Sequence, residues 1–326
     1  MIKARVYRSS QREFECKVIA TGEFVSATAM GKLLKGKDHQ IVVGDFVTLE
    51  ETNDDPKYKI IEIDKRYGEV FRVIVREASK KVTASNIDLL IITTSVSEPV
   101  YKRGIIDRFL VRAYQWNIKP IIVFNKMDEY DPESFDIKFE RDRLSVLGIE
   151  CFEMSALDDT YKKKYLELGK DELMTVLRGK TALFLGQSGV GKSQIITSLS
   201  NKKFELKTGG VGKWGKGTHT TSWSEIIDLD NFLVVDSPGV RSLSLEDLPS
   251  EDFISYFPDL VDMSVQCKFQ NCTHMENAKG CAFRDKLDPD NYDDALVLSR
   301  LDSFIRIFDE LSQIPEWANR ITGKRS

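Results

Sequence analysis

The feature that most constrains the fold lies in residues 181–193, which read TALFLGQSGVGKS. Five β-prone residues are followed by a run that matches G-x-x-x-x-G-K-[ST] at every position: Gly186, Gln187, Ser188, Gly189, Val190, Gly191, Lys192 and Ser193. In this pattern a buried strand turns sharply into a helix, and backbone N–H groups surround phosphate oxygens. Lys192 would neutralise the β- and γ-phosphates, Ser193 would bind Mg²⁺, and Gln194 would open the helix that faces the phosphates. The motif predicts a nucleoside triphosphate site.

Length and composition predict two or three globular domains. The chain has 326 residues, of which 41% are hydrophobic and 30% charged. No apolar run approaches the roughly 20 residues that span a bilayer, and the N-terminus carries no secretory signal pattern. The net charge of −4 excludes a uniformly basic nucleic-acid coat, so RNA contacts must come from local patches. We therefore expect a cytoplasmic protein with no membrane partner.

Residues 1 to about 76 predict short strands separated by turns. The segments 42–49 and 58–63 are rich in β-prone residues, and no long helix is expected among them. Five such strands suit an OB-fold barrel, a fold that often binds nucleic acid. The first 40 residues carry eight lysines or arginines against four acidic residues. A solvated barrel surface explains this bias as well as RNA binding does.

From about residue 86 the pattern becomes α/β. The apolar runs 87–92 and 120–124 predict buried parallel strands, and helical spacing over 105–116 lies between them. The second strand delivers Asn125, Lys126, Met127 and Asp128 at its carboxyl end, where ligands of such sheets bind. The Asp128 carboxylate can accept two N–H groups from guanine, whereas adenine presents an acceptor there. The combination predicts GTP.

Further segments complete the predicted site. A third strand ends at Ser155 and Ala156, which would back the guanine, and a charged helix is expected over 161–177. Residues 202–221 contain five glycines and five lysines, which predicts either a segment ordered by nucleotide or a plain linker. That segment ends at Thr221, a candidate Mg²⁺ ligand. A strand over 231–235 leads into Asp236-Ser-Pro-Gly239, where Asp236 would hold Mg²⁺ through water and Gly239 would contact the γ-phosphate.

The order of these motifs is unusual, because the guanine motifs precede the phosphate motif. Together with VVGDFV, IDRFLV, HTT, DSPG and FPDL, this order resembles the RsgA (YjeQ) family of circularly permuted GTPases, which help to mature the small ribosomal subunit. The resemblance implies a multidomain α/β protein. We predict an RNA-binding OB-fold over 1–78, a circularly permuted P-loop GTPase domain over 79–244 and a helical zinc-binding domain over 245–326.

Four metal-ligating residues gather near the C-terminus, namely Cys267, Cys272, His274 and Cys281. Three thiolates and one imidazole form a complete tetrahedral set for structural zinc, with unrelated cysteines as the alternative. The resemblance implies the same four ligands and one zinc per chain. Beyond them, Leu301, Phe304, Ile305, Phe308 and Leu311 recur at helical spacing and predict the packed face of a terminal helix.

The catalytic residue is harder to assign. In Ras-type enzymes a glutamine after the D-x-x-G glycine orients the attacking water, but Val240 stands there in this chain. His219 is the candidate instead, and the resemblance points to the same histidine; the alternative is a solvated loop imidazole. We therefore expect slow hydrolysis that the small subunit stimulates.

We expect a monomeric GTPase that acts late in small-subunit assembly, with GTP or GDP, Mg²⁺, the small subunit and its rRNA as partners. One alternative is a GTP-dependent RNA-binding assembly factor with negligible turnover. Another is a small-molecule P-loop kinase, which the Asn125–Asp128 motif disfavours.

Overall fold

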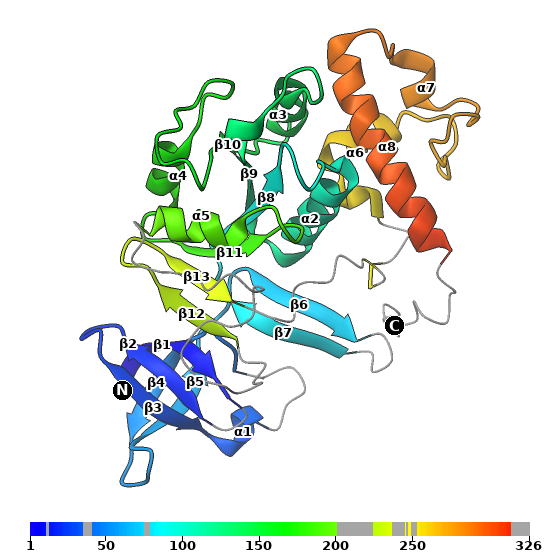
Figure 1. Ribbon diagram of the computed structural model, residues 1–326. Helices are drawn as coiled ribbons and strands as arrows, with labels where there is room; N and C mark the ends of the chain where they lie inside the picture. Colours follow the sequence, from blue (N-terminus) through cyan, green and yellow to red (C-terminus); the bar gives the residue numbers. More distant parts are fainter. Residues whose placement is uncertain are drawn as a thin grey trace.

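The computed structural model describes residues 1–10, 13–34, 41–74, 79–200, 224–236, 245, 247–248 and 253–313. Figure 1 shows a small N-terminal barrel, a central sheet with helices on both faces, and a helical C-terminal part. No helix within these ranges is long and apolar enough to cross a bilayer.

Five short strands form the N-terminal barrel, as the sequence predicted. They are β1 (Ile2–Ser9), β2 (Phe14–Val18), β3 (Phe24–Ala29), β4 (Phe46–Glu51) and β5 (Tyr58–Ile63), with the one-turn helix α1 (Gly31–Leu34) after β3. The strands pair in the order β1-β2-β3-β5-β4, and β4 pairs back to β1, so the barrel is closed. Alternate residues point inward, and Ala4, Val6 and Cys16 are fully buried.

The strand expected from residue 42 begins only at Phe46. Residues 42–45 form a turn instead, in which the backbone N–H of Asp45 donates to the Val42 carbonyl and the Asp45 carboxylate accepts from the Val42 N–H. Gly44 has φ +94°, and a Cβ there would lie 2.0 Å from the Ser85 carbonyl oxygen. Only glycine permits this approach between the barrel and the segment before the central sheet.

The central sheet has helices on both faces. Its strands are β8 (Leu89–Ser95), β9 (Lys119–Asn125), β10 (Cys151–Glu153), β11 (Thr181–Leu185), β12 (Glu225–Asp228) and β13 (Leu233–Asp236). They lie in the order β10-β9-β8-β11-β13-β12, all parallel except β12, which is antiparallel to β13. All seven residues of β8 are buried, as its continuous apolar run predicted.

Two hydrophobic clusters cover the two faces of this sheet. On one face pack α2 (Arg103–Trp116) and α3 (Ile137–Ser145), and on the other pack α4 (Lys170–Leu177) and α5 (Lys192–Leu199). Phe109 and Leu110 of α2 belong to the first cluster, whereas Leu173 of α4 and Ile195 of α5 belong to the second. This doubly wound arrangement leaves the carboxyl ends of the parallel strands available for a ligand.

The helix expected over 161–177 is shorter than predicted, because α4 begins at Lys170. The preceding segment is held by the buried Glu153 side chain, whose oxygens accept hydrogen bonds from the backbone N–H groups of Lys164, Tyr165 and Leu166. These N–H groups are therefore satisfied without a helix. Gly169 then caps α4.

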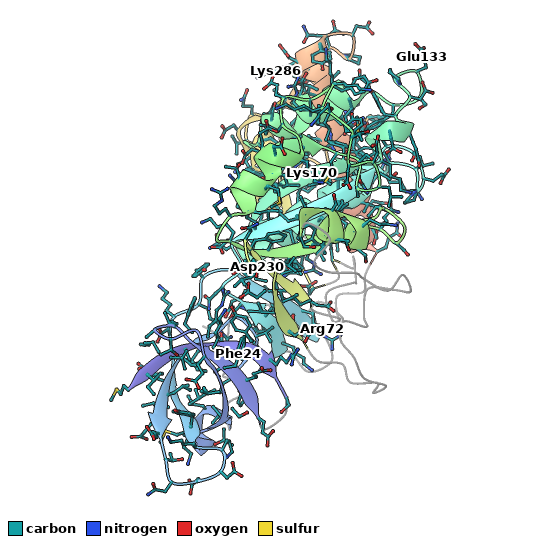
Figure 2. The ribbon with its side chains drawn as sticks, turned by 60° about the vertical axis from the view of Figure 1, so that its left-hand side comes forward. Phe24, Arg72, Glu133, Lys170, Asp230 and Lys286 are labelled. Carbon is teal, nitrogen blue, oxygen red and sulfur yellow. The ribbon has the colours of Figure 1, made fainter. Side chains whose placement is uncertain are left out.

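The barrel and the central sheet share one continuous sheet, because β1 pairs with β12. Arg5 of β1 is buried between the two parts, and its guanidinium donates to Thr181 Oγ1 at 2.8 Å and to the Asn86 carbonyl at 2.9 Å. Figure 2 shows the barrel, with Phe24, directly beside the β12–β13 turn that carries Asp230. The two parts are thus joined by backbone pairing and by a buried cation.

A separate two-stranded sheet links the barrel to the central domain (Figure 1). Its strands β6 (Glu69–Ile74) and β7 (Ser79–Ser85) are antiparallel. The Trp116 indole N–H of α2 donates to the Phe71 carbonyl at 3.0 Å, which fastens this sheet to the central domain.

The C-terminal part consists of η4 (Phe253–Tyr256), α6 (Pro258–Ser264), α7 (Ala282–Lys286) and α8 (Tyr292–Ser312). Its core contains Phe253, Phe257 and Phe283, together with Leu301 and Phe304 of the predicted terminal helix. In Figure 1, α8 runs alongside α2 and α3. All five residues of the predicted stripe, including Ile305, Phe308 and Leu311, pack in this core, as expected.

Candidate nucleotide and metal sites

The loop 186–191 has the backbone geometry of a phosphate-binding turn. Gly186, Gly189 and Gly191 have φ values of +154°, +85° and +93°. A Cβ on Gly186 would lie 2.3 Å from the Thr93 carbonyl oxygen, and a Cβ on Gly191 would lie 2.3 Å from Asn125 Nδ2. Side chains at these two positions would therefore prevent the loop from lying against β8 and β9.

The helix α5 starts at Lys192, directly after this turn, so its N-terminal N–H groups and positive dipole end face the loop. The Lys192 ammonium donates to the Gly186 and Gln187 carbonyls at 2.8 and 2.7 Å. Ser188 and Gly189 are exposed, whereas Ser193 and Gln194 are half-buried at the first turn of α5. The loop therefore combines a cation, a helix N-terminus and glycine backbone in one place.

Asn125 joins three segments that lie far apart in the sequence. It is buried at the end of β9, its Nδ2 donates to the Val190 carbonyl at 2.9 Å, and its Oδ1 accepts from the Ala156 backbone N–H at 3.0 Å. The guanine motif, the Ser155-Ala156 segment and the phosphate loop are thus connected by one side chain. This juxtaposition is the one the sequence predicted.

The remaining candidate guanine-site residues lie around Asn125. Asp128 lies in η2 (Met127–Glu129) with an exposed side chain. Ser155 is buried, and its Oγ accepts from the Asp158 backbone N–H at 3.2 Å. Lys126 has φ +63° and donates to the Glu98 carbonyl. The Asp128 carboxylate is therefore accessible to a nucleobase, and the preceding residues Asn125 and Lys126 are held by the surrounding loops.

Sequence reasoning missed the loop 97–99, which lies against this site. Besides the Lys126–Glu98 contact, Ser97 Oγ donates to the Glu129 carboxylate, and Pro99 Cδ would be 3.7 Å from a Cβ on Gly189. No sequence motif marks residues 97–99, because their contacts with the site depend on the position of the turn after β8. This loop borders both the guanine motif and the phosphate loop.

The candidate Mg²⁺ ligands are only partly described. Ser193 is the second residue of α5, which follows β11. Asp236 ends β13, which pairs in parallel with β11, so both residues reach the same end of the sheet. A hydroxyl and a carboxylate are the oxygen ligands that Mg²⁺ prefers. Thr221, Gly239 and His219 lie outside the described residues.

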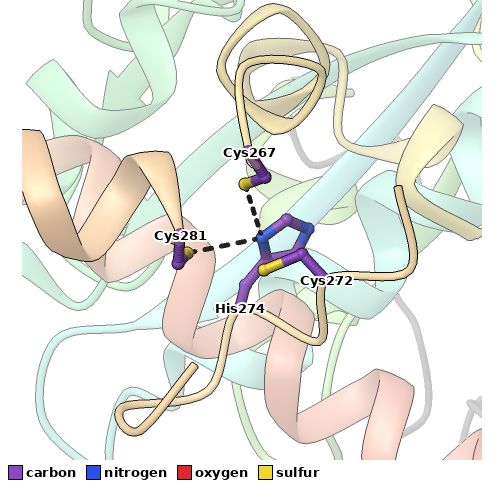
Figure 3. Close-up of side chains that lie close together, drawn as sticks. All are labelled: Cys267, Cys272, His274 and Cys281. Atoms are coloured by element: carbon purple, nitrogen blue, oxygen red, sulfur yellow. Dashed lines mark hydrogen bonds between the residues drawn. The ribbon is translucent and has the colours of Figure 1, made fainter. Parts of the chain in front are cut away.

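The second candidate site is the cluster of Cys267, Cys272, His274 and Cys281, shown in Figure 3. Their ligand atoms all lie within 4.8 Å of one another, and His274 Nδ1 is 3.6 Å from both Cys267 Sγ and Cys281 Sγ. Tetrahedral zinc, with Zn–S of about 2.3 Å and Zn–N of about 2.0–2.1 Å, requires an S···N separation of about 3.5–3.6 Å. The donor set and its spacing therefore fit zinc.

The surroundings of this cluster favour a structural role. His274 has φ +57°, its ring packs at 5.1 Å from the Phe283 ring, and the Ala282 N–H donates to Cys267 Sγ at 3.3 Å. Burial raises the pKa of the Cys267 thiol to about 11, so a cation is needed to hold it as a thiolate at neutral pH. A set of four protein ligands leaves no position for a substrate.

The sheet order and these loops define a P-loop GTPase fold whose chain order is permuted: the guanine motifs on β9 and β10 precede the phosphate loop on β11, yet all reach the same end of the sheet.

Comparisons with known proteins agree with this class. A family model described as RsgA GTPase matches residues 65–246. The protein of Flavobacterium psychrophilum called small ribosomal subunit biogenesis GTPase RsgA is 31% identical over 93% of this chain and 91% of its own length. The protein of the same name from Bacillus pumilus is 33% identical over 83% of this chain and 85% of its own length.

Solved structures show the same architecture. YjeQ from Thermotoga maritima superposes with a TM-score of 0.72 at 25% identity, covering 96% of this chain and 99% of that one. YloQ, described as a circularly permuted GTPase, superposes with a TM-score of 0.70 at 23% identity, covering 97% and 96%. The chain belongs to the RsgA GTPase family, as its motifs indicated.

Proposed function

We propose that the chain is a GTPase that acts late in the assembly of the small ribosomal subunit. The observation that carries the nucleotide part is the position of Asn125, which connects the phosphate loop to both guanine motifs. The names of the relatives from Flavobacterium psychrophilum and Bacillus pumilus support the ribosomal part. We propose a cytoplasmic monomer that binds small-subunit rRNA through the barrel and the zinc module.

Each site residue has a proposed role. Asp128, with Asn125 and Lys126, would recognise guanine, and Ser155 and Ala156 would back the base. The loop 186–191, Lys192 and Gln194 would hold the phosphates. Mg²⁺ would be held by Ser193, Asp236 and Thr221, and would neutralise charge on the phosphates. Gly239 would contact the γ-phosphate, and His219 would orient the attacking water; both stay predictions.

The first test is the base preference of Asp128→Asn. An asparagine offers a donor where guanine also presents a donor, so GTP affinity should fall by at least about a hundredfold and xanthosine triphosphate affinity should rise. Isothermal titration calorimetry with GTP, ATP and xanthosine triphosphate measures this. Glu133→Gln, an exposed carboxylate five residues along, should bind GTP as the parent does. Unchanged GTP affinity in Asp128→Asn would contradict the assignment.

Phosphate release, measured with and without purified small subunits, tests the ribosomal part. We expect slow release alone and at least about a hundredfold stimulation by subunits, which is what a positioned catalytic group typically contributes. Binding to subunits without measurable release would favour the GTP-dependent assembly factor with negligible turnover. Release that subunits do not change would exclude the proposed role.

A further inference from the structure

A row of charged side chains crosses four adjacent strands, from the barrel to the proposed Mg²⁺ site. Glu15 of β2 lies opposite Arg8 of β1, Arg8 lies opposite Glu225 of β12, and Glu225 lies opposite Asp236 of β13. Directly opposed residues of antiparallel strands project from the same face, with Cβ atoms about 5 Å apart. The row therefore reads acid, base, acid, acid, and its last member is the first residue of the D-x-x-G motif.

The hydrogen bonds of Arg8 confirm that this row is formed. Arg8 Nε donates to Glu225 Oε2 at 2.9 Å, and Arg8 Nη1 donates to Glu15 Oε2 at 3.2 Å. The Arg8 side chain is 54% exposed, whereas that of Glu225 is 17% exposed. One solvent-accessible cation of the barrel is thus shared between a carboxylate of the barrel and a carboxylate of the GTPase domain.

Glu225 and Asp236, the two acids at the end of the row, carry like charges that repel each other. Like charges directly opposite in a sheet are unfavourable, and a cation on either side relieves them. Arg8 supplies one such cation to Glu225, and Mg²⁺ beside Asp236 would supply another. The negative charge of Glu225 would therefore attract a Mg²⁺ ion held beside Asp236, and the positive charge of Arg8 would offset part of that attraction.

We propose that Glu225 and Arg8 are positioning residues that set the Mg²⁺ affinity of the nucleotide site in opposite directions. This inference rests on the proposed GTP-binding function. Because Arg8 is accessible from solvent, an anion such as an RNA phosphate at the barrel can bind it. The bound anion neutralises Arg8, so Arg8 offsets less of the negative charge of Glu225 and Mg²⁺ binds more tightly. By linkage, Mg²⁺ and nucleotide strengthen the binding of that anion equally.

The test is a Mg²⁺ titration of the binding of a fluorescent, non-hydrolysable GTP analogue to the full chain. Glu225→Gln should raise the Mg²⁺ midpoint roughly two- to fivefold, and Arg8→Gln should lower it by a similar factor. Arg8→Lys, which keeps the charge, should restore a midpoint near that of the parent. These differences should shrink at 1 M salt, where screening acts over only about 3 Å.

The Lys17–Asp228 ion pair is a matched control. It also joins the barrel to β12, at 2.8 Å, but Asp228 lies opposite Leu233, at the other end of β13 from Asp236. Asp228→Asn should therefore disturb docking of the barrel without moving the Mg²⁺ midpoint. An unchanged midpoint in Glu225→Gln, or an equal shift in Asp228→Asn, would overturn the inference. A parent chain without Mg²⁺-dependent GTP binding would overturn the proposed function, and the inference with it.

Discussion

Asn125 connects three segments of the proposed nucleotide site through one side chain. Asn125→Ala would leave the Val190 carbonyl and the Ala156 N–H without their side-chain partners. An unmade hydrogen bond at a buried group costs about 1–3 kcal/mol, so we expect the free energy of unfolding to fall by about 2–4 kcal/mol. GTP and GDP affinities should fall by similar factors, because the change loosens the loop around the phosphates that both nucleotides share.

Urea unfolding and calorimetric titration measure these two effects. Asn231→Ala is the control, because Asn231 is exposed in the β12–β13 turn and its loss should change stability by no more than about 0.5 kcal/mol. A stable Asn125→Ala variant with unchanged nucleotide affinity would show that the three segments are held together by other contacts.

At this scale the motif residues could be predicted and their partners could not. The spacing of the phosphate loop and of Asn125–Asp128 reflects chemistry that any guanine site needs, so these positions are readable in the sequence. The contact between Lys126 and the Glu98 carbonyl involves a backbone oxygen, which every residue has, so no residue type marks it. The same holds for the backbone N–H groups that Glu153 binds.

Among the elements, the loop between α6 and α7 that carries the proposed zinc ligands makes the most direct prediction. Freshly reduced protein should contain one zinc per chain, and Cys272→Ser should contain well under one equivalent. Because zinc binding and local folding are coupled, hydrogen exchange should accelerate across residues 265–285. α8 should stay protected, since its Phe304 packs against Phe253 and Phe257 and its Arg300 is held by Asp259.

Metal analysis and hydrogen exchange with mass spectrometry measure both outcomes. Met275→Ala, which changes an exposed neighbour of His274, should keep its zinc. A full equivalent of zinc in Cys272→Ser, or equal protection of residues 265–285 in both variants, would contradict the ligand assignment.

Most elements of the GTPase domain were predictable, because buried parallel strands have continuous apolar runs and the helices between them have helical spacing. The prediction of a helix over 161–177 was wrong for residues 161–169, where the Glu153 side chain binds the backbone. Glu153 precedes that segment by about ten residues and satisfies its N–H groups, and periodicity carries no information on such a contact.

At the scale of the whole molecule, a buried ion network joins the C-terminal helices to the GTPase domain. Asp107 of α2 binds Arg143 of α3 at 3.0 Å and also binds Arg300 of α8, whose Nε donates to Asp259 of α6 at 2.8 Å. Burial alone would raise the pKa of Asp107, but Arg143 and Arg300 outweigh it and hold that pKa below its usual value. The carboxylate is therefore charged at neutral pH.

Asp107→Asn leaves Arg143 and Arg300 buried with one carboxylate fewer, so we expect a loss of about 3–5 kcal/mol of unfolding free energy. A group whose pKa is lowered on folding stabilises above its unfolded pKa and loses that effect as pH falls through the folded value. The difference in unfolding free energy between the parent and Asp107→Asn, measured by urea unfolding, should therefore persist at neutral pH and narrow only below about pH 4.

The exposed Lys119–Glu150 pair is the control, since Lys119→Ala should cost no more than about 1 kcal/mol. An Asp107→Asn loss as small as that would show that the network does not hold the two parts together. The three-part organisation was predictable from changes in pattern along the chain. The ion network was not predictable, because each of its members is a single charged residue on a helix. In the sequence alone, such residues are expected to face solvent.

The pairing of β1 with β12 has a consequence for deletion experiments. A chain that begins after the barrel would lack β1, so Glu225 would lose its strand partner Arg8 and more of the β12 edge, a template for aggregation, would be exposed. It would also lose Arg5, whose guanidinium donates a hydrogen bond to Thr181 Oγ1 at the start of β11, the strand before the phosphate loop. Weak ribosome binding by such a fragment would therefore report self-association and a damaged nucleotide domain as much as a missing RNA surface. Point substitutions on the outer face of the barrel separate these causes.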